Sequence, residues 1–209
     1  MKDFRLYAIT GEEFHKGREL LEVMEAAILG GADIIQLRDK KSSKRDVLTK
    51  ARALRELTKK HDVLFIVNDH IDVALAVDAD GIHLGQDDLP LSEARKIMGP
   101  NKIIGISTHA IEEAREAEKN GADYIGVGPV FPTKSKEDVV APVTTAYVQE
   151  VAREITIPFV AIGGIKLHNV DQVLAAGATR ICAVSEIVGA DDIIKTCETF
   201  KKKLHREAI

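Results

Sequence analysis

Short runs of β-branched and aliphatic residues recur along the chain, and each is followed by a longer segment whose apolar positions repeat with a helical period. The short runs are nearly continuous in apolar residues, which is typical of strands covered on both faces in a parallel sheet. The predicted strands are residues 5–10, 33–38, 64–69, 81–85, 103–108, 124–130, 158–164 and 180–185.

The segments between these runs predict amphipathic helices. In the first of them, an apolar stripe is expected from Leu20, Leu21, Met24, Ala27 and Ile28, and two glycines then end the helix. The same pattern predicts further helices, among them residues 46–60, 111–121 and roughly 190–206.

The junctions from helix to strand repeat one pattern, seen in GGADIIQL, DADGIHL, NGADYIGVG and AGATRICAV. Strands that alternate with helices predict βα units joined by right-handed crossovers. Eight such units in succession favour an α/β fold of the (β/α)₈ TIM-barrel type, with residues 1–209 as a single domain. A doubly wound open sheet is the alternative, although no GxGxxG turn follows the first predicted strand.

Composition narrows the classes of partner. The net charge of −4, the aromatic content of 4% and the absence of Trp argue against binding to nucleic acid or to an acidic membrane surface. No segment approaches the roughly 18 apolar residues of a membrane span, and no signal peptide is recognisable, so we expect a cytoplasmic protein. Cys182 and Cys197 form no metal-binding pair and are expected to be reduced, buried thiols. The sequence leaves open whether the chain forms a homo-oligomer.

In a barrel of this type, the active site is built from residues at and just after the carboxyl ends of the strands. Many polar residues occupy those positions here, so we expect them to converge around one mouth. They are Gln36, Arg38, Lys40, Asn68, Asp69, Gln86, Asp87, Asp88, Ser107, Thr108, His109, Thr133, Ser135, Lys136, Gly163, Gly164 and Ser185.

The first group suits a phosphorylated ligand. Gln36, Arg38 and Lys40 are spaced by two, so on an extended chain their side chains point the same way. Arg offers a planar fork of donors and Lys a point charge, and both match phosphate oxygens. The alternative is that RDKK is only a solvated turn.

Two carboxylates predict a magnesium site beside this group. Asp69 and Asp88 follow adjacent strands, and Mg²⁺ is often held by one or two carboxylates together with substrate phosphates. Asp69 could instead cap the following helix, and either Asp87 or Asp88 could face inward.

A second anion-binding zone is predicted after the sixth strand, in GVGPVFPTKSK. Its glycines are expected to leave room at the mouth, while Thr133, Ser135 and Lys136 are presented to an anion. Gly163 and Gly164 are expected to open a helix, where backbone N–H groups can approach a phosphate; a tight turn is the alternative.

Two histidines near the mouth are given smaller roles. His83 is interpreted as a packed core side chain, and His109 as a residue that opens a helix, with contact to the substrate as the alternative. No nucleophile elbow or zinc-binding pattern is found.

These stretches resemble the thiamine-phosphate synthase family of transferases. QLRDK, NDHIDVALA, GIHLGQDD, GIST, GADYIGVGPVFPTKSK and AIGGI occur in family order across about residues 5–190. The resemblance implies a (β/α)₈ barrel in the thiamine biosynthesis pathway. Its reaction joins 4-amino-5-hydroxymethyl-2-methylpyrimidine diphosphate to 4-methyl-5-(2-phosphoethyl)thiazole and releases diphosphate.

The resemblance also implies roles for individual residues. Those that bind the pyrimidine diphosphate would be Gln36, Leu37, Arg38, Asp39, Lys40, Asn68, Ser107 and Lys136. Those that bind the thiazole phosphate would be Thr133, Lys134, Ser135, Gly164, Val184 and Ser185. Asp69 and Asp88 would bind Mg²⁺, and the catalytic group would be Arg38, Lys40, Ser107 and Lys136. The chain departs from the family pattern at Gly11, at Glu186 and in residues 137–145.

Two other functions remain as alternatives. A thiazole tautomerase of the same fold needs no metal–diphosphate site, and the presence of Asp69, Asp88, Arg38 and Lys40 argues against it. A non-catalytic barrel that binds a phosphorylated metabolite is the third possibility. All three interpretations predict phosphorylated small molecules as ligands.

Overall fold

The computed structural model describes residues 2–133 and 141–206. The strands are β1 (Leu6–Ile9), β2 (Ile34–Leu37), β3 (Leu64–Asn68), β4 (Gly81–Leu84), β5 (Ile103–Thr108), β6 (Tyr124–Val127), β7 (Phe159–Ile162) and β8 (Ile181–Ala183). The helices are η1 (Glu12–Phe14), α1 (Leu20–Leu29), α2 (Lys44–Lys60), α3 (Ile71–Ala76), α4 (Leu91–Met98), α5 (Ile111–Lys119), α6 (Thr144–Glu154), α7 (Val170–Ala175), α8 (Ser185–Val188) and α9 (Ile193–Arg206).

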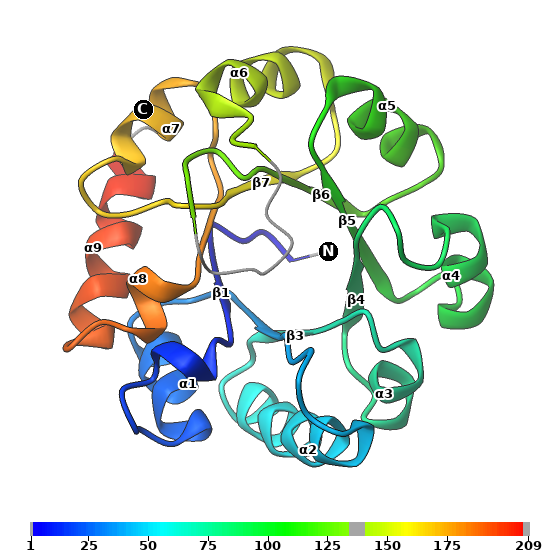
Figure 1. Ribbon diagram of the computed structural model, residues 1–209, viewed down its shortest axis with the longest axis vertical. Helices are drawn as coiled ribbons and strands as arrows, with labels where there is room; N and C mark the ends of the chain where they lie inside the picture. The colour runs from blue at the N-terminus through cyan, green and yellow to red at the C-terminus, as the bar shows by residue number, and fades with distance from the viewer. Residues whose placement is uncertain (1, 134–140, 207–209) are drawn as a thin grey trace.

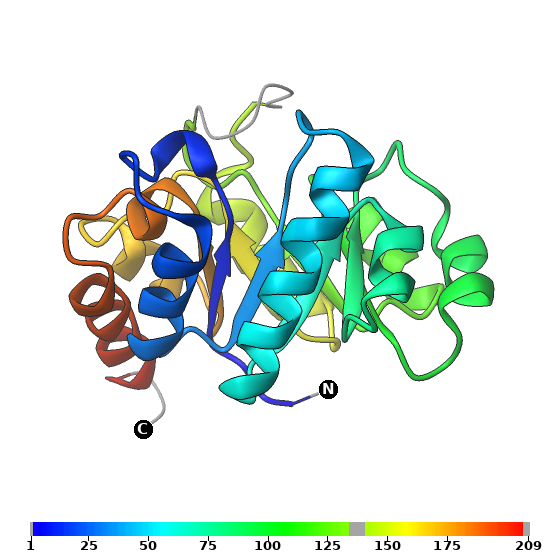
Figure 2. The same ribbon diagram turned by 90° about the horizontal axis from the view of Figure 1, so that it is seen from below.

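The strands form a closed parallel barrel in sequence order, with the helices arranged around it (Figure 1). The ring closes where β1 pairs with β8, with Leu6 opposite Ile181. The (β/α)₈ prediction is therefore confirmed, and the open-sheet alternative is wrong because no strand in this ring is left as an edge. Seen from the side, the strands run upward, and both the segment before β1 and the last turn of α9 lie at the lower end (Figure 2).

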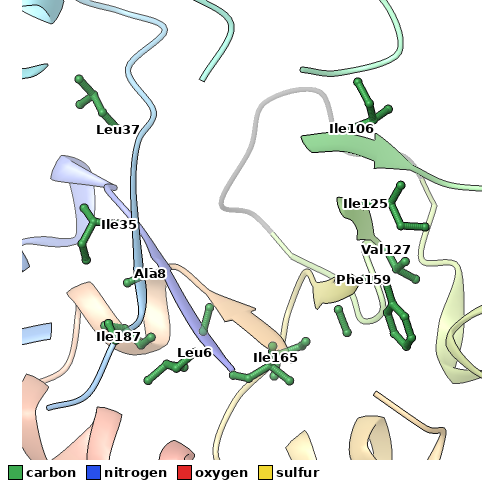
Figure 3. Packing of buried hydrophobic residues seen from close by; sticks show 14 of the residues in the cluster. Leu6, Ala8, Ile35, Leu37, Ile106, Ile125, Val127, Phe159, Ile165 and Ile187 are labelled. Carbon is green, nitrogen blue, oxygen red and sulfur yellow. The ribbon is translucent and has the colours of Figure 1, made fainter. Parts of the chain in front are cut away.

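Successive strand residues alternate between two cores, because side chains on a strand point to opposite faces. Leu6, Ala8 and Ile35 point outward and pack between the strands and the helices (Figure 3). Tyr7 and Ile34 point inward, into a smaller cluster that fills the barrel. The buried residues of that inner cluster are Phe4, Tyr7, Ile9, Ile34, Ile66, Ile103, Tyr124, Val160 and Cys182.

The inner core depends on one glycine. A Cβ atom on Gly105 would lie 2.1 Å from Cζ of Tyr124, so only glycine at this position leaves space for the tyrosine ring. Tyr124 is fully buried, and its ring stacks at an angle against Phe4 and Tyr7, each with ring centroids 6.0 Å away. Gly105 therefore places a large polar-tipped side chain at the centre of the barrel.

The repeated Ala-Asp junctions have a structural role at the amino ends of the strands. Asp33 accepts hydrogen bonds from the backbone N–H groups of Arg5 (2.8 Å) and Leu6 (2.9 Å). The Asp80 carboxylate accepts one from Phe65 at 2.7 Å, and the Asp123 carboxylate accepts one from Ile104 at 2.8 Å. Each aspartate thus fastens the strand that it precedes to the strand before it; the fourth junction has Thr179 at this place.

Three details predicted from the sequence were wrong: the end of one strand, the buried face of one helix and the number of helices near the C-terminus. β6 ends at Val127 rather than at residue 130, because Pro129 has no N–H to continue the ladder. Leu21 does not share the buried stripe of α1: it is 42% exposed, and Val23 is buried in its place. The short helix α8 was not predicted, since the last helical pattern was expected to begin only near residue 190.

Across residues 2–133 and 141–206, no helix combines the length and apolar character needed to cross a membrane.

Candidate active site

A cavity of about 830 Å³ opens at the carboxyl ends of the strands. Most of the residues predicted to converge there do line it. The predicted residues among its lining are Arg38, Lys40, Asn68, Asp69, Gln86, Asp87, Asp88, Ser107, His109, Thr133, Gly163, Gly164, Val184 and Ser185.

Two carboxylates and one ammonium group meet on one side of this cavity. Nζ of Lys40 lies 3.3 Å from Oδ2 of Asp69. Burial raises the pKa of the Asp69 carboxyl, the adjacent Asp88 carboxylate raises it further and shares a hydrogen bond with it, and Lys40 acts in the opposite direction. Two acidic groups held this close repel each other when both are ionised, so the pair favours a bound cation or proton.

Local backbone geometry places each carboxylate. Asp69 has φ of +61°, a left-handed conformation that is uncommon for a residue with a side chain but is tolerated by Asp more than by most. It does not cap α3, since that helix begins after His70 without a side-chain cap. Asp88 accepts a hydrogen bond from the backbone N–H of Gly85 at 2.6 Å. Asp87 is exposed, so Asp88 is the member of the pair that contacts Asp69.

These carboxylates fit Mg²⁺, because they supply hard oxygen ligands and leave room for oxygens from a ligand. Within the described part of the chain, no group of three His, Cys, Asp or Glu side chains is arranged to hold a metal ion. A metal here therefore depends on two carboxylates together with donors that a bound ligand brings.

The segment from Gln36 to Lys40 sends its side chains in different directions. Arg38 lines the cavity, and its backbone N–H donates to the Thr10 hydroxyl at 2.9 Å. Gln36 points into the barrel and is buried, outside the set of residues that line the cavity. Leu37 points outward into the packing against the helices, as Figure 3 shows. Its side chain therefore does not face the mouth.

Asp39 also turns away from the cavity. Its carboxylate accepts a hydrogen bond from Lys50 Nζ at 2.7 Å and others from the backbone N–H groups of Lys41 and Ser42. Burial raises the pKa of this carboxyl, but the hydrogen bonds from Lys50 and Ser42 outweigh burial and hold the pKa well below its ordinary value. Asp39 thus holds the loop that carries Arg38 and Lys40.

A line of polar groups leads from the cavity into the barrel. Ser107 Oγ lies 2.9 Å from Nε2 of His83, whose Nδ1 lies 2.9 Å from the hydroxyl of Tyr124. His83 was expected to be a packed core side chain, but it is half-buried and paired at both ring nitrogens. Sequence reasoning missed its link to Ser107; the available signal was a histidine at an inward position of a strand whose neighbours carry Asn68 and Ser107.

The opposite side of the mouth is formed by the loops after β6, β7 and β8. Thr133, Gly164, Val184 and Ser185 line it. Lys134, Ser135 and Lys136 lie outside the described residues. The structure thus brings four of the predicted thiazole-phosphate residues to this side.

The glycine pair forms a tight turn rather than the start of a helix. Gly163 has φ of +96° and Gly164 has φ of +64°, whereas α7 begins only at Val170. A Cβ atom on Gly163 would lie 2.4 Å from Cα of Pro129. The glycines are required because this turn packs directly against the loop after β6, so the helix-terminus argument for phosphate binding was wrong.

Two departures from the family pattern have visible partners. Glu186 accepts a hydrogen bond from the backbone N–H of Leu167 at 3.1 Å, so its charge lies against the loop after β7. A Cβ atom on Gly11 would lie 3.0 Å from both Phe14 and Val184, so a larger residue there would crowd the cavity lining.

The family model and the curated relatives that match point to the same family. The family model described as thiamine monophosphate synthase matches residues 6–187. The chain is 78% identical over 209 residues to a thiamine-phosphate synthase of Halalkalibacterium halodurans, covering 100% of this chain and 99% of that protein. It is 70% identical over 193 residues to the protein of the same description from Shouchella clausii, covering 92% of each. A solved thiamine phosphate pyrophosphorylase from Pyrococcus furiosus superposes with a TM-score of 0.88 at 40% identity, over 97% of this chain and 96% of that one.

Proposed function

Because the chain belongs to the thiamine monophosphate synthase family, we propose that it is a transferase that joins 4-amino-5-hydroxymethyl-2-methylpyrimidine diphosphate to 4-methyl-5-(2-phosphoethyl)thiazole. The products are thiamine phosphate and diphosphate. The observation that carries this proposal is the cluster of Asp69, Asp88 and Lys40, which lines the same cavity as Arg38 at the barrel mouth. A pair of carboxylates next to two cations suits a metal-bound diphosphate.

The chemistry breaks one bond and forms another. The bond between the pyrimidine methylene carbon and the diphosphate oxygen breaks, and the diphosphate leaves with the electron pair. The lone pair of the thiazole nitrogen then forms a bond to that carbon. Arg38 and Lys40 stabilise the negative charge that grows on the leaving group, which is the type of electrostatic assistance that contributes most to many enzymes. No enzyme nucleophile is needed.

Asp69 and Asp88 would hold Mg²⁺ in this site. The bound ion would supply further positive charge to the departing diphosphate. Lys40 contacts Asp69 and therefore keeps its ammonium group beside the place where that charge develops.

The remaining residues divide between the two substrates. We assign Asn68 and Ser107 to the pyrimidine diphosphate, with Lys136 outside the described residues. The Gln36 side chain is buried and does not line the cavity, so it acts on this substrate only through the side chains that it bonds inside the barrel. Leu37 contributes through its backbone alone, and Asp39 acts by holding the loop, because neither side chain faces the cavity.

The thiazole phosphate is assigned to the other side of the mouth. Its described residues are Thr133, Gly164, Val184 and Ser185, and Lys134 and Ser135 complete the set. Backbone and hydroxyl donors dominate here, which suits a phosphate monoester held without a metal ion.

One assay separates this function from its rivals. The purified chain is mixed with both substrates, with and without Mg²⁺, and thiamine phosphate is measured by chromatography. Synthase activity predicts product only when both substrates and Mg²⁺ are present. A parallel mixture contains only a thiazole carboxylate phosphate isomer. A tautomerase would convert that isomer, whereas a binding protein would form no product in any of the mixtures.

A pair of variants tests the metal assignment. Asp88→Asn removes a carboxylate that contacts Asp69, and we expect the coupling rate to fall at least about a hundredfold. Asp87→Asn removes the same charge from the neighbouring exposed position and should retain nearly full activity. Equal losses in the two variants would contradict the assignment of Asp88 as the metal ligand.

A further inference from the structure

A continuous chain of hydrogen bonds crosses the interior of the barrel and ends at the cavity. Nε2 of Gln36 donates to the hydroxyl of Tyr7 at 2.7 Å, and the hydroxyls of Tyr7 and Tyr124 lie 2.9 Å apart. The Tyr124 hydroxyl lies 2.9 Å from Nδ1 of His83, and Nε2 of His83 lies 2.9 Å from Oγ of Ser107. The five side chains come from five different strands.

The chain is shielded from water at its inner end. Gln36 is 2% exposed, Tyr7 1% and Tyr124 0%. Burial raises the pKa of both tyrosines, so each hydroxyl keeps its proton. A buried hydroxyl hydrogen without an acceptor carries a substantial free-energy cost, so the arrangement of protons in this chain is restricted.

The amide of Gln36 sets the direction of that arrangement. Its nitrogen can only donate, so the Tyr7 oxygen accepts from Gln36 and directs its own hydrogen to Tyr124. Tyr124 then directs its hydrogen to Nδ1 of His83. In the reverse direction, Tyr7 would accept from both Gln36 and Tyr124, and its own hydrogen would lose the Tyr124 oxygen as its acceptor.

We propose that this chain fixes His83 as the neutral tautomer protonated at Nε2 and thereby makes Ser107 a hydrogen-bond donor toward the substrate. His83 donates to Ser107 Oγ, so the serine directs its own hydrogen into the cavity. His83 and Tyr124 are positioning residues, which act through Ser107. The proposal rests on the proposed function, because Ser107 is assigned there to the pyrimidine diphosphate.

The consequence is a rule for substrate selection at this point of the cavity. A fixed donor selects a ligand atom that accepts a hydrogen bond, such as an unprotonated ring nitrogen or a phosphate oxygen. A ligand with an N–H or O–H group at that place meets a second donor and is disfavoured, since both groups would be left without an acceptor.

The tautomer of His83 can be measured without substrate. In protein labelled with ¹⁵N-histidine, the ring signals of His83 are assigned by their loss in His83→Gln. We expect a neutral ring with hydrogen on Nε2 and none on Nδ1. A ring protonated on Nδ1, or on both nitrogens, at neutral pH would overturn the proposal. The measurement stands even if the wild-type chain fails to make thiamine phosphate, which would refute the proposed function instead.

Kinetics of two matched tyrosine variants test the effect on substrate. Tyr124→Phe removes the hydroxyl that bonds His83, and we expect kcat/KM for the pyrimidine diphosphate to fall about tenfold, as for the loss of one oriented hydrogen bond. KM for the thiazole phosphate should stay within about twofold. Tyr7→Phe interrupts the chain between Gln36 and Tyr124 but leaves the Tyr124–His83 bond, so we expect a loss in the same direction that is smaller, about two- to fivefold. Circular dichroism checks that each variant is folded.

A double variant separates positioning from a general loss of structure. In a Ser107→Ala background there is no serine donor left to orient, so adding Tyr124→Phe should lower kcat/KM by no more than about twofold. If Tyr124→Phe still causes the full tenfold loss, or if both KM values rise together, Tyr124 and His83 only support the barrel and the proposal is wrong. His83→Gln, which keeps a donor near Ser107, should retain more activity than His83→Leu.

Discussion

Replacing Gly105 with alanine is expected to disrupt the centre of the barrel. The new Cβ atom would lie 2.1 Å from Cζ of Tyr124 and 2.4 Å from its Cε1 and hydroxyl oxygen. Carbon atoms pack at about 3.5–4.0 Å, so the ring would have to move by more than about 1 Å. It has little freedom to do so, because Phe4, Tyr7 and His83 surround it.

The magnitude follows from this geometry. Overpacking of a core costs about 1–3 kcal/mol, and a rigid buried ring places Gly105→Ala near 3 kcal/mol. For a chain of this size, that free energy corresponds to a fall in Tm of roughly 6–12 °C. Because Tyr124 carries the hydroxyl that bonds His83, the folded fraction should also lose activity toward the pyrimidine diphosphate.

Urea unfolding followed by circular dichroism measures this effect, and Gly126→Ala is a matched control. Gly126 also faces the barrel interior, but its nearest contact would be Cε1 of His83 at an ordinary 3.4 Å. We expect the control to change the free energy of unfolding by less than about 1 kcal/mol. Equal midpoints for the two alanine variants would refute the argument that Tyr124 is rigidly held.

Three further predictions concern the loops and the metal. Lys50→Met should lower the free energy of unfolding by about 2 kcal/mol at pH 7, because it leaves the Asp39 carboxylate without its cation. This magnitude lies between those typical of exposed and of buried ion pairs. The folded-state pKa of Asp39 is depressed, so the stabilisation by the Lys50–Asp39 pair is present above the ordinary Asp pKa of about 4 and is lost as pH falls below it. Urea unfolding of wild type and variant at pH 7 and pH 3 should therefore show a smaller difference in stability at pH 3. An equal difference at both pH values would contradict an origin in the ionised Asp39 carboxylate. Removal of divalent ions with EDTA should abolish product formation, and added Mg²⁺ should restore it; full activity in EDTA would exclude the metal site. Lys136→Ala should weaken binding of the pyrimidine diphosphate more than that of the thiazole phosphate in calorimetric titrations, and equal weakening would argue against its assigned role.

The sequence was sufficient to predict the barrel because the signal repeats. Most strands are nearly continuous in apolar residues, and three helix–strand junctions carry the aspartate that fastens neighbouring strands. The strand ends were harder to predict. Gly128 and Gly163 continue the apolar pattern in sequence. In the structure, Pro129 interrupts the hydrogen bonding of β6, and the turn at Gly163 packs against Pro129.

The carboxylate pair was also predictable, because carboxyl ends of adjacent parallel strands meet at one edge. Asp69 and Asp88 follow β3 and β4, and they do come into contact. What the sequence did not indicate is which aspartate of the pair at 87 and 88 faces inward, since that depends on the bend after Gly85.

The polar chain through the barrel was missed for a physical reason. In a strand buried on both faces, inward and outward positions are equally apolar, so the pattern does not distinguish them. Tyr7 and Tyr124 look like ordinary core residues in sequence, and they meet only because the barrel brings β1 and β6 across from each other. For the same reason, the sequence from Gln36 to Lys40 does not indicate which of its side chains face the cavity, although strand alternation turns Leu37 away from the mouth.

The aspartate at each of three junctions has a consequence for how the chain is assembled. Asp33, Asp80 and Asp123 join β1 to β2, β3 to β4 and β5 to β6, always between strands made one after the other. A nascent chain on the ribosome can therefore form each of these pairs of strands as soon as its second strand is synthesised, because closing the short connection between them costs little conformational entropy. The pairing of β1 with β8 can form only after β8 is synthesised. Until then, β1 is an exposed edge strand, and edge strands can pair with other chains.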